Sequence, residues 1–337
     1  MSDSLDMTDV GEGKMPNTRR PMSEIERGER ESVSKVSVII PTKNRADDLR
    51  CTLDSLMIQT RRPGEIIVVD QGSSPALKSS DFQVPLTYIH APCVSGAAVA
   101  RNVAMDRATG DIWVFLDDDV ILEPEYIEEL LHAYLPEVTG VSGIFINYTI
   151  APLARRLFEI VFVKGAFHDD RQRIYWHAGD LQRHGLQRVK QFTGAVMSFR
   201  AAALRALRFD PNLTGGSLAE DIDLCARLPR GAVLVIAPKA RLFHKRSAIG
   251  RPTGHWLEEH AQSSAYMRAR NWHRGLGDDI CFGWLQIGHV LMATIGSLKR
   301  GSLEPFRAWR RGRARGLSLG SPSATPSSCG YARETPA

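Results

Sequence analysis

The chain has 337 residues, of which 43% are hydrophobic and 24% are charged, and its formal net charge is +5. This length and hydrophobic content are enough for one large domain or two small ones with a sizeable core. They exclude a peptide hormone or a disordered tail. The five cysteines lie far apart without a C-x-x-C pair, which argues against a disulfide framework or a structural zinc site. We therefore expect the protein to function in a reducing cytoplasm.

The two ends of the chain have compositions typical of disorder. Residues 1–34 carry charges throughout, and their large apolar side chains occur only singly, which predicts a disordered segment rather than a signal peptide. Residues 320–337 are rich in Ser and Pro and predict a disordered tail.

Residues 35–119 alternate short apolar runs with segments of helical periodicity. The runs predict strands at 35–40, 65–70, 86–90 and 111–117, and the periodic segments predict helices at 45–59 and 96–108. In the first helix, Leu49, Leu53, Leu56 and Met57 lie on one stripe. Because continuous Val and Ile runs leave no polar face for water, these strands should form a parallel sheet with helices on both faces.

Polar residues follow three of these strands: "PTKNR" after Ile40, "DQGS" from Asp70, and the acidic triplet 117–119. The carboxyl ends of parallel strands meet at one edge of the sheet, where ligands gather. The triplet itself has two interpretations, because adjacent carboxylates repel. It is either a solvated loop that caps a helix beginning near Pro124, or a site for a cation.

A nucleotide site of this kind would lack the usual phosphate loop. Neither G-x-x-x-x-G-K-[ST] nor G-x-G-x-x-G follows the first strand. Carboxylates cannot neutralise a diphosphate directly, but they can hold Mg²⁺ or Mn²⁺ against it.

Three stretches together resemble a known family. "VSVIIPTKNRADDLRCTLDSLMIQ", "EIIVVDQGS" and "GAAVARNVAMDRATGDIWVFLDDDV" are similar, in order and spacing, to the nucleotide-sugar-binding half of family 2 glycosyltransferases of the GT-A fold. The resemblance covers residues 35–244. It implies an α/β fold of GT-A type, with a mainly parallel nucleotide-binding sheet, helices on both faces and a C-terminal helical extension.

The resemblance also divides the chain. It implies a glycosyltransferase domain at 35–250, with a nucleotide-sugar half at 35–120 and an acceptor and catalytic half at 121–250. A helical, basic extension follows at 251–319.

The resemblance implies a set of nucleotide contacts: Pro41, Thr42, Asn44, Asp70 and Arg101, with Asp117 and Asp118 from the acidic triplet. Asp70 also has a local interpretation, because Asp and Gly are common in turns such as "DQGS". Gln71 stands where the family more often has a second acid, which leaves the base preference open.

The acidic triplet matches the family's D-x-D pattern, bracketed by Asp117 and Asp119. By resemblance, Asp119 is the direct ligand of Mn²⁺ or Mg²⁺, and Asp118 faces the ribose or a metal-bound water. A His at the position of His244 often binds the metal or the diphosphate in GT-A enzymes, although a lone His is more often structural. Lys245 and Arg246 are candidates for holding the diphosphate.

The catalytic base is expected on a helix that begins near residue 220. Ser217 and Glu220 form an S-x-x-E capping box, which would occupy Glu220 and leave Asp221 free to point into the cleft. The family's "ED" motif falls on Glu220 and Asp221, and its carboxylate is the general base toward the acceptor hydroxyl. We expect Asp223 to be a solvated or capping residue and Arg227 to pair with a nearby acid.

The segment "QFTGAVMSFRAAAL", residues 191–204, resembles the strand and turn that line the acceptor pocket in the family. Gly194 suggests a close backbone approach, and Phe192 fits the core as well as a sugar platform. Residues 151–190 carry no motif, and we expect them to help select the acceptor.

The C-terminal part suggests contact with a membrane. Residues 280–298 contain no formal charge, and residues 299–317 carry Lys299, Arg300, Arg307, Arg310, Arg311, Arg313 and Arg315 against the single acid Glu304. We expect a helix lying at an anionic membrane surface, with Trp284, Leu285 and Leu291 inward, and no nucleic-acid partner. The alternative is a core helix followed by a solvated basic tail.

Together these patterns predict a metal-dependent, inverting hexosyl- or deoxyhexosyltransferase, cytoplasmic or peripheral at the inner face of the membrane. It would transfer sugar from a nucleotide-sugar donor to a glycan or lipid-linked acceptor in surface polysaccharide biosynthesis. One alternative is a sugar-phosphate nucleotidyltransferase, although "PTKNRADDL" lacks the glycine- and arginine-rich loop of those enzymes. The other is a non-catalytic membrane- or polyanion-binding protein, which would leave the acidic motifs unexplained.

Overall fold

A computed structural model describes residues 35–77, 86–147, 153–163, 167, 185–213, 220–246, 256–270 and 275–320, all within the compact unit 32–337. The expected disordered segment 1–34, residues 321–337 of the tail and the capping residue Ser217 lie outside the described residues. Most of segment 151–190 lies outside them as well.

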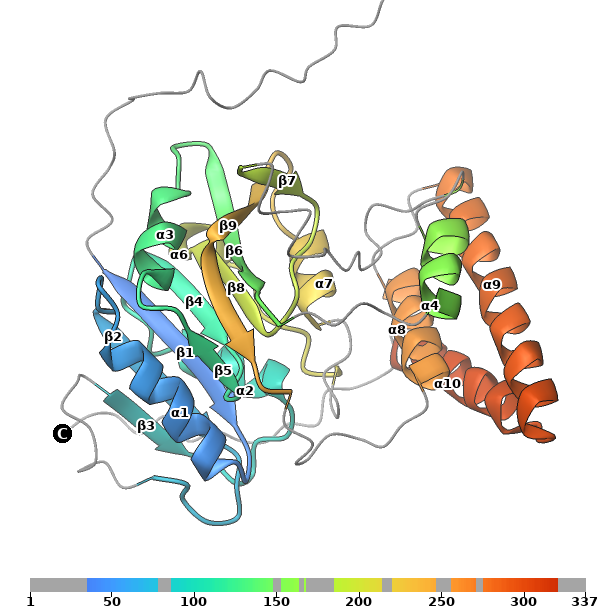
Figure 1. Cartoon of the computed structure of the whole chain (residues 1–337), viewed down its shortest axis with the longest axis horizontal. Helices are drawn as coiled ribbons and strands as arrows, with labels where there is room; N and C mark the ends of the chain where they lie inside the picture. Colours follow the sequence, from blue (N-terminus) through green and yellow to red (C-terminus); the bar gives the residue numbers. More distant parts are fainter. Residues whose placement is uncertain are drawn as a thin grey trace, which may run out of the picture. The chain divides into compact units, whose positions relative to one another are not determined.

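One sheet forms the centre of the fold (Figure 1), with the strand order β3-β2-β1-β4-β8-β6-β9-β5 and with β7 paired to β9. The strands in the described residues are β1 Val36–Thr42, β2 Glu65–Asp70, β3 Leu86–His90, β4 Ile112–Leu116, β5 Val120–Leu122, β6 Val138–Phe145, β7 Gln187–Val189, β8 Val196–Arg200 and β9 Val233–His244. Strands β3, β2, β1 and β4 are parallel, as expected for the nucleotide-sugar half. Beyond β4 the sheet is mixed, because β8 is antiparallel to both β4 and β6.

Helices cover both faces of this sheet. The helices are α1 Ala46–Met57 and α3 Tyr126–His132 on one face, and α2 Ala97–Met105, α6 Ala201–Leu204 and α7 Glu220–Ala226 on the other. In α1, Leu49, Leu53 and Leu56 are fully buried against β1 and β4, which confirms the predicted stripe, while Met57 is only partly buried at its edge. The small side chains of α2 let that helix lie close to the opposite face of the sheet.

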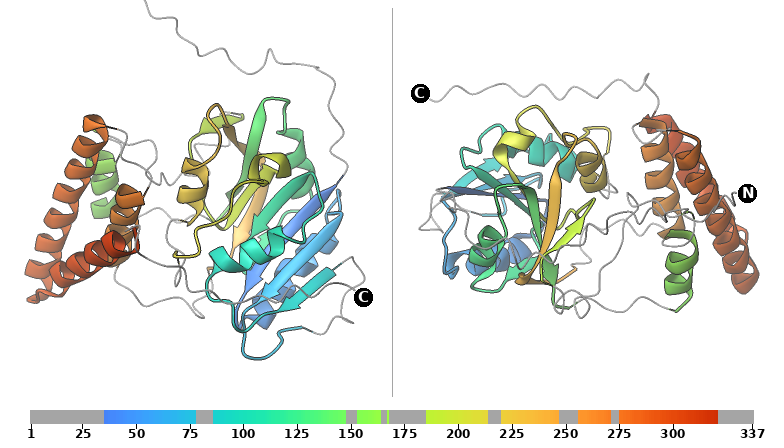
Figure 2. Two further views of the ribbon diagram at one scale, coloured as in Figure 1. Left: turned by 180° about the vertical axis from the view of Figure 1, so that it is seen from behind. Right: turned by 90° about the horizontal axis from the view of Figure 1, so that it is seen from above.

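The C-terminal part is helical, as the sequence predicts. Figure 2 shows its helices, α8 Trp256–Arg270, α9 Leu276–Arg300 and α10 Glu304–Gly320. Two elements from the middle of the chain, α4 Leu153–Phe158 and the π-helical turn η3 Glu159–Val163, pack with α9. Helix α10 packs on α8 through Gly312, Gly316 and Gly320; a Cβ atom on Gly316 would lie 2.3 Å from the carbonyl oxygen of Gln262. The Tyr266 hydroxyl of α8 donates a hydrogen bond to Asp210, which follows α6 in the chain.

Helix α9 contains the uncharged run. Its length and composition would allow it to cross a membrane. Leu285 is buried and Trp284 donates a hydrogen bond to the carbonyl oxygen of Val161, so these two residues contact protein, whereas we expected them to face the membrane with Leu291. Helical periodicity places Leu285 about 120° around the axis of α9 from Leu291.

Candidate functional site

The polar ends of β1, β2 and β4 lie together at one edge of the sheet, as the sequence predicts. Thr42 at the end of β1 is opposite Asp70 at the end of β2, and the acidic triplet follows Leu116 at the end of β4. The backbone N–H of Gln71 donates to the carbonyl oxygen of Thr42 at 2.9 Å, which ties the two loop entries together.

Asp117, Asp119 and His244 form a cluster at this edge. Each offers one ligand atom, and the three atoms lie within 4.8 Å of one another. Pairing of β5 with β9 places His244 opposite Val120, so that its Nε2 lies 3.0 Å from Oδ1 of the buried Asp119. The Asp117 side chain is 31% exposed and opens the cluster to solvent.

The donor set of this cluster fits a divalent metal. Carboxylate oxygens suit Mg²⁺ and Mn²⁺, and an imidazole nitrogen suits a transition metal such as Mn²⁺. Three protein ligands with one side open to solvent leave coordination positions for oxygens of a substrate. The cluster includes the expected ligands Asp119 and His244 and adds Asp117.

The Asp118 side chain is not part of the cluster of Asp117, Asp119 and His244. Its carboxylate accepts hydrogen bonds from the Thr42 hydroxyl at 2.7 Å and from Nη1 of Arg45 at 2.9 Å. Burial raises the pKa of Asp118 to about 6, although the bonds from Thr42 and Arg45 act in the opposite direction. Arg45 also lies 4.0 Å from Asp119 and was not among the predicted site residues.

Asp70 is buried and is engaged by its own loop. Its carboxylate accepts the backbone N–H groups of Gly72 at 2.7 Å and Ala76 at 2.8 Å, and also the Tyr88 hydroxyl. These contacts fit the local turn interpretation of "DQGS". Asn44 lies beside this turn, because a Cβ atom on Gly72 would be 2.8 Å from its Oδ1.

Arg101 links the acidic triplet to helix α7. The side chain is 1% exposed, and its guanidinium donates to Glu220 at 2.8 Å, to Asp117 at 3.0 Å and to the carbonyl oxygen of Gly194 at 2.9 Å. The sequence predicts that Arg101 approaches the nucleotide, and the structure shows it bridging two carboxylates. A buried guanidinium needs such partners to offset its loss of hydration.

Asp221 is not free, contrary to our expectation. It is buried, its Oδ2 accepts the backbone N–H of Gly194 at 2.6 Å, and its Oδ1 accepts the backbone N–H of Ile222 at 2.9 Å. The neighbouring Glu220 binds Arg101, and burial together with Asp221 raises the pKa of the Glu220 carboxyl despite that guanidinium. A Cβ atom on Gly194 would lie 3.1 Å from Glu220 Oε1, which confirms the close backbone approach.

Three further expectations concern neighbouring residues. Arg227 pairs with Asp223 at 2.6 Å, as predicted, but Asp223 is buried rather than solvated, because almost the whole of the short helix α7 is buried. Phe192 belongs to the core, where it packs against Phe199. Lys245 forms an ion pair with Asp48 of α1 at 2.6 Å.

A family model described as "Glycosyl transferase family 2" matches residues 37–208. A pre-mycofactocin glycosyltransferase of Mycobacterium tuberculosis is 32% identical over 219 residues, which are 62% of this chain and 42% of the relative. The glycosyltransferase GlyA of Streptococcus pneumoniae is 34% identical over 237 residues, which are 67% of this chain and 32% of the relative. The chain thus spans less than half the length of both relatives.

Other similar proteins are matched over more of their length. The succinoglycan biosynthesis protein ExoM of Rhizobium meliloti is 25% identical over 67% of this chain and 70% of the relative. The solved structure of S. aureus TarS 1-349 in complex with UDP-GlcNAc has a TM-score of 0.55 at 18% identity, with 85% of this chain and 82% of that chain covered. GalNAc-T7 with UDP, GalNAc and Mn²⁺ has a TM-score of 0.50 at 15% identity, with 72% and 49% covered, so the fold is of GT-A type.

Proposed function

This chain belongs to glycosyl transferase family 2, and from that premise we propose that it is a metal-dependent, inverting enzyme. It transfers a hexosyl or deoxyhexosyl group from a nucleotide-sugar donor to a glycan or lipid-linked acceptor. Family membership argues against the nucleotidyltransferase and against the non-catalytic binding protein. The cluster of Asp117, Asp119 and His244 at the carboxyl edge of the sheet is the observation that carries the proposal.

The donor binds at the ends of β1, β2 and β4. Pro41, Thr42, Asn44 and Asp70 border the base and ribose, Asp118 faces the ribose, and Arg101 holds Asp117 on the nucleotide side of the site. Asp117, Asp119 and His244 would hold Mn²⁺ or Mg²⁺, which supplies Lewis-acid stabilisation to the departing diphosphate. The proximity of their ligand atoms supports this assignment.

The general base is Asp221. Its carboxylate is oriented by the N–H groups of Gly194 and Ile222 and removes the proton from the attacking acceptor hydroxyl. Arg101 and Glu220 fix the start of α7 relative to the metal ligands, so that base and leaving group stay on opposite sides of the transferred sugar. Displacement from the face opposite the nucleotide inverts the anomeric carbon.

The names of two similar proteins and the C-terminal helices support the proposed acceptor and location. ExoM is named for succinoglycan biosynthesis, which supports a role in surface polysaccharide assembly. UDP-GlcNAc in the TarS structure supports a nucleotide-sugar donor. The enzyme acts in the cytoplasm at the inner face of the membrane, where a lipid-linked acceptor would be exposed.

Thermal unfolding with a panel of nucleoside diphosphates, each with Mn²⁺ and with chelator, tests this function. The donor's nucleotide should stabilise the protein by about 2.7 kcal/mol at a hundred times its Kd, and mainly when Mn²⁺ is present. Asp119→Asn should remove the Mn²⁺-dependent part of this stabilisation, because it replaces a charged metal ligand by a neutral amide.

Asp54→Asn on the exposed side of α1 is the matched control and should behave like the unaltered protein. Equal stabilisation by nucleotide in Mn²⁺ and in chelator, for both the unaltered protein and Asp119→Asn, would overturn the metal assignment.

A further inference from the structure

Helix α9 exposes a stripe of apolar residues. Ile287 is 57% exposed, Leu291 47% and Leu298 79%, and Ile280 and Ile295 continue the same stripe at helical spacing. The other side buries Leu285 and Ala293 together with His289, whose Nε2 lies 2.7 Å from Nδ1 of His260 in α8, while Gln286 accepts a hydrogen bond from Arg313 of α10. A helix that faces water exposes polar and charged residues on that side, and α9 exposes apolar ones instead.

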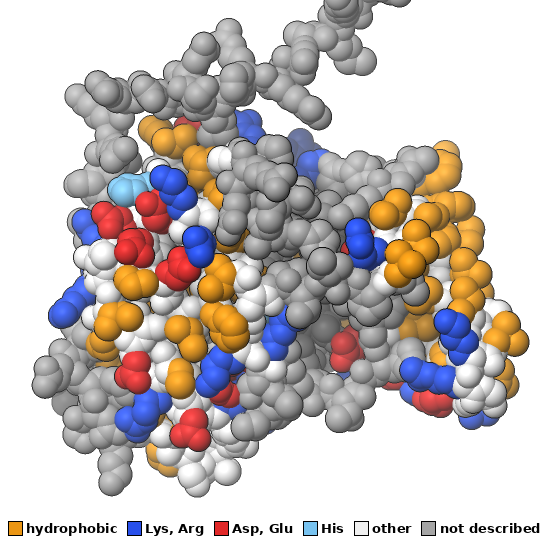
Figure 3. Space-filling model, in the orientation of Figure 1, with side chains coloured by type: hydrophobic (Ala, Val, Ile, Leu, Met, Phe, Trp, Pro, Cys, Tyr) orange, Lys and Arg blue, Asp and Glu red, His pale blue; other side chains and the backbone are white. Residues whose placement is uncertain are grey.

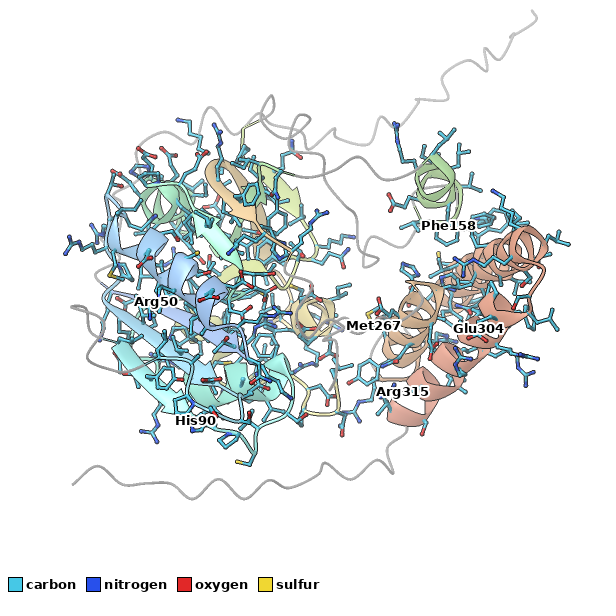
Figure 4. The ribbon with its side chains drawn as sticks, turned by 60° about the horizontal axis from the view of Figure 1, so that its bottom comes forward. Arg50, His90, Phe158, Met267, Glu304 and Arg315 are labelled. Atoms are coloured by element: carbon cyan, nitrogen blue, oxygen red, sulfur yellow. The ribbon has the colours of Figure 1, made fainter. Side chains whose placement is uncertain are left out.

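A second element extends the apolar surface. Leu157 of α4 and Ile160 and Val161 of η3 are exposed. The indole N–H of Trp284 in α9 donates to the carbonyl oxygen of Val161 at 2.9 Å, so that η3 and the edge of the α9 stripe adjoin. The inner side of α4 is anchored by Phe158, which stacks on His289 at a centroid distance of 5.7 Å and points toward α8 and α9 in Figure 4.

Cations lie at one end of this surface. Lys299 and Arg300 end α9, and Arg307, Arg310 and Arg315 are exposed on α10. In Figure 3, hydrophobic side chains gather along the right-hand edge, over α9, and Lys and Arg side chains appear at its lower end. The combination of an apolar stripe and adjacent cations matches the boundary between acyl chains and anionic headgroups.

We infer that the exposed stripe of α9, together with Leu157, Ile160 and Val161, is a docking face for an anionic lipid bilayer. The helix lies along the membrane surface with one side in the lipid. It does not cross the bilayer, because its other side is covered by protein and carries His289 and Gln286, which are costly in hydrocarbon. We prefer a bilayer to a second copy of the chain as the occupant of this face. A second copy would place further cations beside Lys299 and Arg300, whereas anionic headgroups would neutralise these two residues.

Co-sedimentation of the full chain with vesicles tests the docking face. The chain should sediment with vesicles that contain phosphatidylglycerol, and less with pure phosphatidylcholine or at high salt. Ile287→Gln and Leu291→Gln should each weaken binding about tenfold, because each removes one apolar side chain from the lipid. Ile58→Gln, at a 63% exposed site beside α1, is the matched control and should sediment normally.

Failure of this inference can be separated from failure of the proposed function. Both α9 variants should keep the Mn²⁺-dependent stabilisation by nucleotide, since their side chains are exposed and belong to other elements than the site. Equal sedimentation of Ile287→Gln and the unaltered chain would overturn the inference, and so would the absence of sedimentation with anionic vesicles. A dimer in gel filtration that Ile287→Gln converts to a monomer would assign the stripe to a second copy instead.

Discussion

Two adjacent acids at the start of α7 have different surroundings. Asp221 accepts the backbone N–H groups of Gly194 and Ile222, while Glu220 pairs with the buried Arg101 and contributes to a network that includes Asp117. The Arg101 contact ties Glu220 to the acidic triplet and gives it a positioning role in the proposed mechanism. Burial raises the pKa of the Glu220 carboxyl, which makes Glu220 the alternative to Asp221 as the base.

Asp221→Asn should therefore lower kcat by at least about a hundredfold, the smaller effect typical of losing a general base. Asn keeps the side-chain shape but does not take up the proton, so affinity for the nucleotide should survive. The measurement is release of nucleoside diphosphate from the donor, beside nucleotide binding followed by thermal shift.

Asp223→Asn is the matched control, because Asp223 lies two residues away and pairs with Arg227. It should reduce stability more than turnover. Nearly normal turnover by Asp221→Asn would move the base to Glu220, and a product with the donor's anomeric configuration would contradict inversion.

The sequence predicts part of this site and misses another part for a physical reason. The acidic triplet and the strand pattern predict that Asp119 and Asp70 lie at the carboxyl ends of parallel strands, at one edge of the sheet, and His244 is expected near them by resemblance. The Arg101–Glu220 ion pair joins residues 119 positions apart, and no local pattern indicates such a partner. The sequence gives a weak indication that Arg45 contacts the triplet, because this cation follows β1 and β1 ends at the same edge of the sheet.

At the scale of elements, the packing of α10 on α8 depends on glycine rather than on large apolar side chains. Gly312, Gly316 and Gly320 recur every four residues and form one side of α10, where the backbones approach closely. The sequence prediction for this segment considered only its Lys and Arg residues, and it therefore missed the glycine stripe. The short strands β5 and β7 are also absent from the predictions, because pairing with the distant β9 forms them.

Gly316→Ala should destabilise the protein by about 1–3 kcal/mol. The added methyl group would lie 2.3 Å from the Gln262 carbonyl and 2.9 Å from Ala265 Cβ, both on α8, so the helices must separate. Urea unfolding followed by circular dichroism measures the change as a lower midpoint.

Gly283→Ala in α9 is the matched control. Nothing lies within 4 Å of the position its Cβ would occupy, so it should stabilise the helix by up to about 1 kcal/mol through propensity alone. Equal effects of the two substitutions on the unfolding midpoint would show that the close approach of α10 and α8 does not determine the loss of stability in Gly316→Ala.

At the scale of the whole molecule, the sheet holds the candidate chemistry and the C-terminal helices support it. Tyr266 and Met267 of α8 pack with Ile222 of α7, and Arg270 forms an ion pair with Asp210 at 3.0 Å. Helix α7, which carries Glu220 and Asp221, therefore contacts helix α8 of the C-terminal extension. Conditions that loosen the extension should also affect this helix.

The histidine pair between α8 and α9 makes this stability depend on pH. His289 is buried against His260 from α8 and Phe158 from α4, with Arg313 of α10 nearby, and burial, His260 and Arg313 all lower its pKa. In the folded protein His289 stays neutral, while in the unfolded chain it binds a proton below about pH 6.5. Its contribution to stability is therefore complete above that pH and is lost as the pH falls below it.

His289 should add to the free energy of unfolding a contribution that rises with pH between about pH 5 and 7, while Asp118 and Glu220, whose pKa values are raised, contribute in the opposite direction. His289→Gln keeps a hydrogen-bonding amide at this position and removes its titration, so urea unfolding at several pH values should give this variant a less positive slope than the unaltered chain. His132→Gln, at an exposed position of α3 outside this histidine pair, is the matched control and should give the same slope as the unaltered chain. If His289→Gln and the unaltered chain have the same slope, the pH dependence arises from other groups, and the buried pair does not limit the stability of the helical extension.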